Sequence, residues 1–117
     1  MFDPLAISSM AHALAAHASA RQGVIAANVA HADTPGYRAR DVETFTETFR
    51  RMQTEPPRTP AAPRLVAVDP GAALSPNGNS VSVETEMMKA VEARHQFDMA
   101  LGITQSVSGI IRATLGR

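Results

Sequence analysis

The first third of the chain carries apolar side chains at helical spacing. Between about residues 7 and 32 they recur every three or four positions, a period that predicts one amphipathic helix. Pro4 lies at or before the expected first turn, where its missing N–H costs little. We call the recurring positions the N-terminal stripe: Ile7, Ala11, Leu14, Ala18, Gln22, Ile25 and Val29.

The last third of the chain shows a longer form of the same pattern. From Val83 onward the spacing alternates between four and three residues, as in a heptad repeat, and predicts a second helix. We call these positions the C-terminal stripe: Val83, Met87, Ala90, Arg94, Phe97, Leu101, Thr104, Ser108, Ile111 and Leu115. Met88, Val91, Ile103, Val107 and Ile110 widen it, which favours a helix bundle over a two-stranded coil. Ser82 is the expected N-cap, followed by Glu84 and Glu86 in the first turn.

The middle of the chain, residues 38–79, holds most of its eight prolines and cannot form one continuous helix. Residues 41–52 are compatible with a short helix or an extended piece. Residues 65–68 predict a short strand that ends in a turn at residues 69–71. The proline-rich stretch 55–63 is expected to be an extended connector. The segment as a whole should therefore be largely irregular, with room for a short strand or hairpin.

Thr34, Pro35 and Gly36 form a strong stop signal after the first helix. Proline disfavours the helical conformation of the residue before it, and the following glycine can take positive φ. Tyr37, the only tyrosine, suits a half-buried position at which its hydroxyl finds a partner.

The stretch from Ala27 to this tyrosine closely resembles the N-terminal signature of the bacterial flagellar rod and hook axial proteins. The matching residues are Asn28, Val29, Ala30, Ala32, Thr34, Pro35, Gly36 and Tyr37. His31 departs from that signature, which usually has a second asparagine there. A second block resembles the start of the last helix in the proximal-rod members: Gly78, Asn79, Ser80, Val81, Val83, Glu84, Glu86 and Met87. Ser82 stands where those proteins have an aspartate.

This resemblance implies a mainly α-helical fold. The terminal helices would pack as a bundle or coiled coil, forming one structural domain from segments 1–37 and 80–117, with the flexible segment 38–79 between them. The residues expected to carry the structural motif are Asn28, Val29, Ala30, Thr34, Pro35, Gly36, Tyr37, Gly78, Asn79 and Ser80. The residues expected to form the assembly surface are Ile7, Leu14, Ile25, Val83, Met87, Phe97, Leu101, Ile111 and Leu115.

Composition and charge narrow the function further. The chain has 117 residues, equal numbers of acidic and basic side chains and no cysteine. A neutral balance argues against nucleic-acid binding, and the lack of cysteine excludes disulfides and thiolate zinc sites. His12 and His17 lie five residues apart, so they do not share a helix face as a metal pair would, and we expect both at the surface or an interface. We expect no enzyme, cofactor, metal or small-molecule substrate.

The expected function is a structural subunit of the proximal rod of the flagellar basal body. In this role the chain would contact other rod subunits and the ring and rod-base adapter proteins. The resemblance implies passage through the flagellar type III export apparatus without a cleaved signal peptide, and the sequence shows no membrane span. Another rod subunit of the same family, or a small coiled-coil adapter or export chaperone, are the alternatives.

Overall fold

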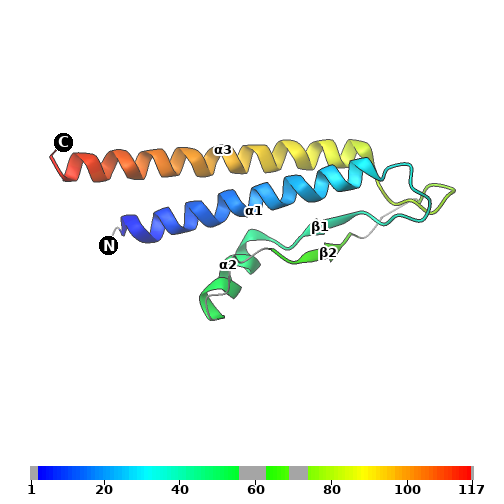
Figure 1. Cartoon of the computed structure of the whole chain (residues 1–117), viewed down its shortest axis with the longest axis horizontal. Helices are drawn as coiled ribbons and strands as arrows, with labels where there is room; N and C mark the ends of the chain where they lie inside the picture. The colour runs from blue at the N-terminus through cyan, green and yellow to red at the C-terminus, as the bar shows by residue number, and fades with distance from the viewer. Residues whose placement is uncertain (1–2, 56–62, 69–73, 117) are drawn as a thin grey trace.

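Two long antiparallel helices form the body of the molecule. The computed structural model describes residues 3–55, 63–68 and 74–116. Helix α1 spans Pro4–Ala30 and helix α3 spans Val83–Thr114, and Figure 1 shows them lying side by side with both chain termini at the same end. The molecule is correspondingly elongated, measuring 64 × 29 × 22 Å. This confirms the mainly helical fold with packed terminal helices.

Side-chain caps define where both helices begin. The Asp3 carboxylate accepts hydrogen bonds from the backbone N–H groups of Leu5 and Ala6, at 3.0 and 3.4 Å. Pro4 is the first helical residue, as expected. The Ser82 hydroxyl accepts from the backbone N–H of Thr85 at 3.3 Å, which confirms the predicted N-cap. Serine therefore fills the capping role for which the resemblance led us to expect an aspartate.

Small side chains line the contact between the two long helices. On α1 the fully or nearly buried apolar residues are Ala11, Ala18 and Ile25, and on α3 they are Ala93, Ala100 and Val107. Each set recurs every seven residues, which is two helical turns, so each set forms a single row. Alanine methyl groups let the two backbones approach closely. The row on α1 belongs to the N-terminal stripe, which therefore packs the chain's own interior.

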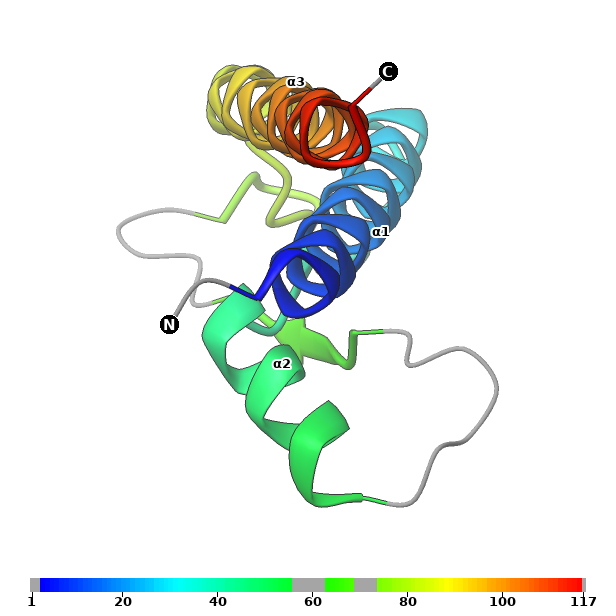
Figure 2. The same cartoon turned by 90° about the vertical axis from the view of Figure 1, so that its left-hand side faces the viewer.

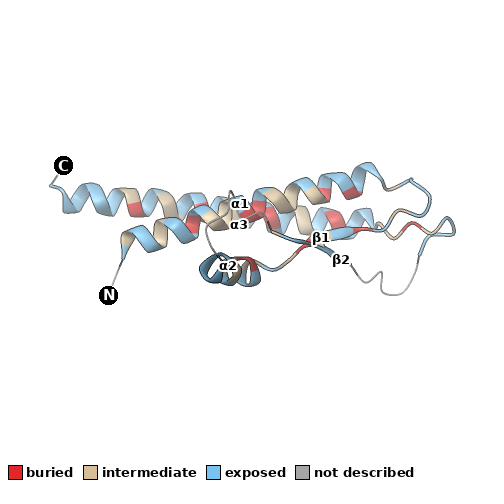
Figure 3. Cartoon of the chain, turned by 60° about the horizontal axis from the view of Figure 1, so that its bottom comes forward, coloured by how far each residue is buried: buried red, intermediate tan, exposed pale blue. Residues whose placement is uncertain are grey.

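The C-terminal stripe lies beside the buried row of α3 and is largely exposed. Val83, Met87, Leu101, Ile111 and Leu115 are all exposed, and Phe97 is half-buried. The buried row consists of Glu86 and the small residues of α3, because one neighbouring helix covers only a narrow face of α3. In addition, α3 extends past the start of α1, and the residues after Ser108 are exposed (Figures 1 and 3).

A small hairpin unit lies on the side of α1 opposite to α3 (Figure 2). It consists of β1 (Arg40–Val42), α2 (Phe45–Thr54) and β2 (Leu65–Ala67). The strands pair antiparallel, with Arg40 opposite Ala67 and Val42 opposite Leu65. The predicted short strand is thereby confirmed, and residues 41–52 contribute to both a strand and a helix. The expected turn at residues 69–71 lies outside the described residues, as do positions 56–62 of the expected connector.

His17 anchors this unit to α1. Its Nε2 atom donates a hydrogen bond to the carbonyl oxygen of Glu43 at 2.7 Å. Its ring packs edge-on against that of Phe45, with the ring centroids 5.7 Å apart. The Phe45 ring in turn packs against that of Phe49, one helical turn later, with the ring centroids 5.6 Å apart. His17 was expected at the surface or an interface; it does not lie at the surface, because α2 folds back over it and leaves the residue only 5% exposed at the contact between α1 and α2. His12 is exposed.

A cluster of charges ties the hairpin to both long helices. Arg21 of α1 contacts the Asp41 carboxylate through two nitrogen atoms, at 3.1 and 3.3 Å, and Lys89 of α3 lies 3.6 Å from the same carboxylate. Burial alone would raise the pKa of Asp41. The hydrogen bonds from Arg21 and the Val42 N–H, together with the two nearby positive charges, outweigh burial and lower that pKa. Asp41 is therefore ionised in the folded chain at neutral pH.

The alanine row predicts a large difference between two identical substitutions. Ala18→Leu should lower the free energy of unfolding by about 1–3 kcal/mol, because Ala18 has no exposed surface and a larger side chain forces the helices apart. Ala16→Leu, on the exposed face of the same helix, should change it by less than about 0.5 kcal/mol. Urea unfolding followed by circular dichroism measures both, and equal midpoints would contradict close packing at Ala18.

The charge cluster predicts a specific pH dependence. Because the pKa of Asp41 is lower in the folded chain than in the unfolded chain, its ionised form stabilises the fold above about pH 4. This contribution is lost as the pH falls through the folded-state pKa. Asp41→Asn should therefore be clearly less stable than the parent at pH 7, and the difference should shrink below about pH 4. Urea unfolding at a series of pH values measures it, and a difference independent of pH would contradict the proposed pairing.

Candidate functional site

The two sequence blocks that carry the family resemblance meet in the structure. The backbone N–H of Gly36 donates to the carbonyl oxygen of Asn77 at 3.0 Å, and the N–H of Ser80 donates to the carbonyl oxygen of Tyr37 at 2.9 Å. The turn after α1 and the loop before α3 are thus joined by backbone hydrogen bonds. We call residues 28–40 together with residues 77–80 the clasp.

Asn79 closes the clasp from the side of α3. It is 2% exposed, and its side-chain amide donates to two carbonyl oxygens, those of His31 at 2.8 Å and Thr34 at 2.7 Å. These carbonyls belong to the end of α1 and the turn that follows, where the helix supplies no partner of its own. The Asn79 side-chain oxygen accepts from the N–H of Val81 at 2.8 Å. One buried side-chain amide therefore forms hydrogen bonds with backbone groups of both the turn after α1 and the loop before α3.

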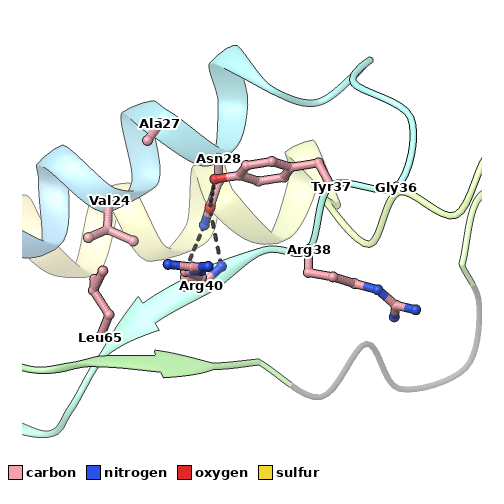
Figure 4. Close-up of a pocket in the computed structure, with 8 residues that line it drawn as sticks. All are labelled: Val24, Ala27, Asn28, Gly36, Tyr37, Arg38, Arg40 and Leu65. Atoms are coloured by element: carbon pink, nitrogen blue, oxygen red, sulfur yellow. Dashed lines mark hydrogen bonds between the residues drawn. The ribbon is translucent and has the colours of Figure 1, made fainter.

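Asn28 closes the clasp from the side of α1. Its side chain is fully buried and forms two hydrogen bonds with the backbone of Arg40, donating to the carbonyl oxygen at 2.7 Å and accepting from the N–H at 3.2 Å (Figure 4). The same oxygen accepts from the Tyr37 hydroxyl at 3.2 Å. Asn28 thus pairs with β1 as a neighbouring strand would. The half-buried tyrosine with a satisfied hydroxyl confirms the sequence expectation.

His31 takes a defined role at the position where the resemblance led us to expect an asparagine. Its ring stacks on Tyr37, with centroids 4.6 Å apart and planes within 6° of parallel. Its Nδ1 atom lies 2.8 Å from the carbonyl oxygen of Ala27. The histidine therefore caps the last turn of α1 and covers one face of the tyrosine ring.

Two glycines lie face to face where the loops cross. Gly36 and Gly78 both have positive φ, at +74° and +82°. A Cβ added to Gly78 would lie 3.6 Å from the Cα of Gly36, whereas a Cβ on Gly36 would meet no atom within 4 Å. The two glycines are required for backbone conformation, as predicted for Gly36, rather than for lack of space.

The other motif residues line the outside of the clasp. Val29, Ala30, Thr34 and Pro35 are exposed. Ser80 accepts a hydrogen bond from the Ala39 N–H at 2.7 Å. Sequence reasoning identified both blocks but missed that they bind each other, and it missed Asn77 and Arg40 as partners. Arg40 acts through its main-chain carbonyl and N–H groups, so its side chain gave no signal. Asn77 uses its main-chain carbonyl and also its side-chain oxygen, which accepts from the Asn79 N–H at 3.1 Å.

A cavity of about 550 Å³ opens beside the clasp. Its lining residues, shown in Figure 4, are Val24, Ala27, Asn28, Gly36, Tyr37, Arg38, Arg40 and Leu65. Within the described parts of the chain, no group of three histidine or acidic side chains is placed to hold a metal ion. None of the helices described here combines the length and apolar character needed to cross a membrane. The contacts of the clasp connect elements and hold them in position.

Because Gly36 is limited by conformation alone, two substitutions of it should differ. Gly36→Val should lower the free energy of unfolding by about 1–2 kcal/mol or more, since a β-branched residue is strained at positive φ. Gly36→Asn should cost clearly less, because asparagine tolerates this region and the site is open. Chemical denaturation compares the two. Equal losses would show that space, not φ, limits this position.

Comparison with known proteins supports the same reading of the clasp. The family model described as "Flagella basal body rod protein" matches residues 11–38, which include the first half of the clasp. The chain is 30% identical to the flagellar basal body rod protein FlgB of Agrobacterium fabrum, over 98% of this chain and 96% of that protein. It is 32% identical to FlgB of Escherichia coli, over 81% of this chain and 80% of that protein. For FlgB of Cereibacter sphaeroides the identity is also 32%, over 82% of this chain and 84% of that protein.

The agreement extends over nearly the whole chain for one relative and over about four fifths for the others. The match to the Agrobacterium fabrum protein therefore spans the clasp, both long helices and the segment between them. The chain belongs to the flagellar basal body rod protein family.

Proposed function

We propose that this chain is a structural subunit of the proximal part of the flagellar rod. In this role it assembles through its terminal helices into a hollow shaft that transmits torque and lets exported subunits pass. The names of its relatives support a rod subunit. The observation that carries the assembly role is the uncovered apolar surface of α3.

We expect this apolar surface to be covered by neighbouring subunits in the assembled rod. Along α3, Met87, Val91 and Leu115 are 62%, 70% and 67% exposed, and further apolar side chains lie between and beside them. Contiguous exposed apolar patches of this kind commonly mark interaction surfaces. The C-terminal end of α3 extends beyond the start of α1 (Figure 1). This projecting part can contact a neighbouring subunit at a different level along the shaft. Contacts of this head-to-tail kind generate helical assemblies.

The clasp has a mechanical role in this proposal. It joins the end of α1 to the start of α3 through the paired loops, with Asn79 and Asn28 buried at the joint. Because Asn79 and the backbone bonds of Gly36 and Ser80 bind the loop before α3 to the end of α1, rotation of one helix against the other would break several hydrogen bonds at once. Asn28 fixes β1 to α1 at the same place. A subunit that transmits torque needs such a joint, and the clasp holds the two assembly helices at a constant angle.

The proposed partners follow from this role. They are other rod subunits, the ring and rod-base adapter proteins and the flagellar type III export apparatus. The proposed location is the rod as it crosses the periplasm, reached without cleavage of a signal peptide. A small coiled-coil adapter or an export chaperone would share the helices but would not be recovered as a component of the rod. A sister rod subunit differs in its position along the shaft, which labelling of purified basal bodies distinguishes.

Leu101 provides the sharpest test of the assembly surface. It belongs to the C-terminal stripe and is 44% exposed, whereas Met99 is 46% exposed and lies outside the stripe. Leu101→Ala should leave the subunit exported but absent from purified basal bodies, because burying leucine in an interface is typically worth about 2–5 kcal/mol in each copy. Met99→Ala should assemble normally.

Immunoblots of the culture medium and of purified basal bodies measure export and incorporation separately. Normal incorporation of Leu101→Ala would show that the C-terminal stripe is not the packing surface. Failure of both variants would extend the interface beyond the stripe to the part of α3 that carries Met99. Failure to recover the parent chain in basal bodies would contradict the proposed function itself.

A further inference from the structure

The strand β2 has one edge that no described residue covers. The N–H of Glu43 donates to the carbonyl oxygen of Arg64 at 2.8 Å, and the register of the hairpin then makes Asp41 and Val66 the next hydrogen-bonded pair. In an antiparallel ladder the intervening residues direct their backbone groups away from the partner strand. The N–H and C=O groups of Leu65 and Ala67 therefore point outward from β1.

The opposite edge of the same sheet is closed. By the same alternation, Arg40 directs its backbone groups away from β2, and there the buried side chain of Asn28 binds both of them. The Val42 N–H donates to the side chain of Asp41 at 2.7 Å. Among the described residues, the outward N–H groups of β1 are thus bound, whereas those of Leu65 and Ala67 on β2 have no partner.

The side chains along this open edge are apolar and accessible. Leu65 is 54% exposed, Val66 is 40% exposed, and Ala67 is exposed as well. A two-stranded sheet is only marginally stable in water. A third strand would supply hydrogen bonds to the open edge and cover its apolar side chains. Exposed apolar edge strands are templates for a further strand unless charge or proline blocks them.

The charges around the hairpin define what such a strand would carry. Arg38, Arg40 and Arg64 are exposed around the hairpin. Asp41 contacts Arg21 and Lys89, and Glu43 contacts Arg51 and the N–H of Arg64. Arg64 lies 3.5 Å from the Glu55 carboxylate, whereas Arg38 and Arg40 contact no acidic side chain of the described residues. Although the chain as a whole is neutral, the surface beside this edge is basic.

We propose that the open edge of β2 binds an extended acidic segment of a neighbouring rod protein as a third strand. Main-chain hydrogen bonds to Leu65 and Ala67 supply affinity, and Arg38 and Arg40 select acidic side chains. A second copy of β2 fits less well, because it would bring two basic hairpins together. The inference adds a strand contact to the proposed rod function, and it rests on that function for the place where the partner is found.

The binding test uses the full chain and a blocked fluorescent peptide in which glutamate and valine alternate over eight residues. Binding should weaken steeply with salt, and the matched lysine–valine peptide should not bind. Ala67→Pro should weaken binding by about tenfold or more, because proline removes an outward N–H and obstructs the edge. The ladder to β1 does not use that N–H, so the hairpin should stay intact. Ala67→Thr, which keeps the N–H, should bind like the parent.

Hydrogen exchange on the parent chain provides a measurement that needs no variant. Binding of the acidic peptide should slow exchange of the Leu65 and Ala67 amides, whereas the Val66 amide is already protected in the ladder to β1. Equal binding of the acidic and basic peptides, or unchanged binding by Ala67→Pro, would overturn the proposal. A dimer that Ala67→Pro abolishes in sedimentation experiments would assign the edge to a second copy and would also overturn it.

Recovery in basal bodies separates this inference from the proposed function. If Ala67→Thr is incorporated into the rod and Ala67→Pro is not, at equal unfolding midpoints, the strand contact is required for assembly. If both are incorporated, the strand contact fails while the rod function stands. If even the parent chain is absent, the rod function fails, and the peptide experiment still decides whether the edge binds acidic strands.

Discussion

The close approach of α1 and α3 through rows of small side chains is the constraint on which the rest of the structure depends. Ala18 and Ala93 have no exposed surface, and the rows to which they belong repeat every two turns. Such packing works only when the helices keep one register over many residues. The charge cluster of Arg21, Asp41 and Lys89 joins the two helices through β1 and opposes sliding of one helix along the other.

The clasp maintains this register at one end of the helix pair. Buried amides are costly unless all their groups find partners, and Asn28 and Asn79 find theirs on backbone groups of β1 and of the turn after α1, respectively. Backbone partners make these contacts insensitive to the identity of residues such as Arg40 or Thr34. They also make it sensitive to loop conformation, which the positive φ angles of Gly36 and Gly78 allow.

The same narrow packing leaves much of the molecule uncovered. Alanine rows bury little apolar area per residue, so the larger side chains of α3 and the edge of β2 remain accessible in a single chain. In a rod subunit this division separates two tasks. Small residues hold the subunit together, and large apolar residues are left for neighbouring molecules.

The sequence by itself determined the local features: both long helices, the start of the first at Pro4, the N-cap of the last at Ser82, the turn at Gly36 and the short strand at residues 65–68. Each depends on spacing or on the conformational limits of one residue type, which are local properties. Only the tertiary structure decided which face of α3 packs on α1, that His17 is buried under α2, and that Asn79 binds the end of α1. Periodicity marks every apolar face of a helix, but it does not say which face a partner of limited width will cover. Contacts to main-chain atoms leave no trace in the partner's side chain, so the pairing of the two motif blocks became visible only in three dimensions.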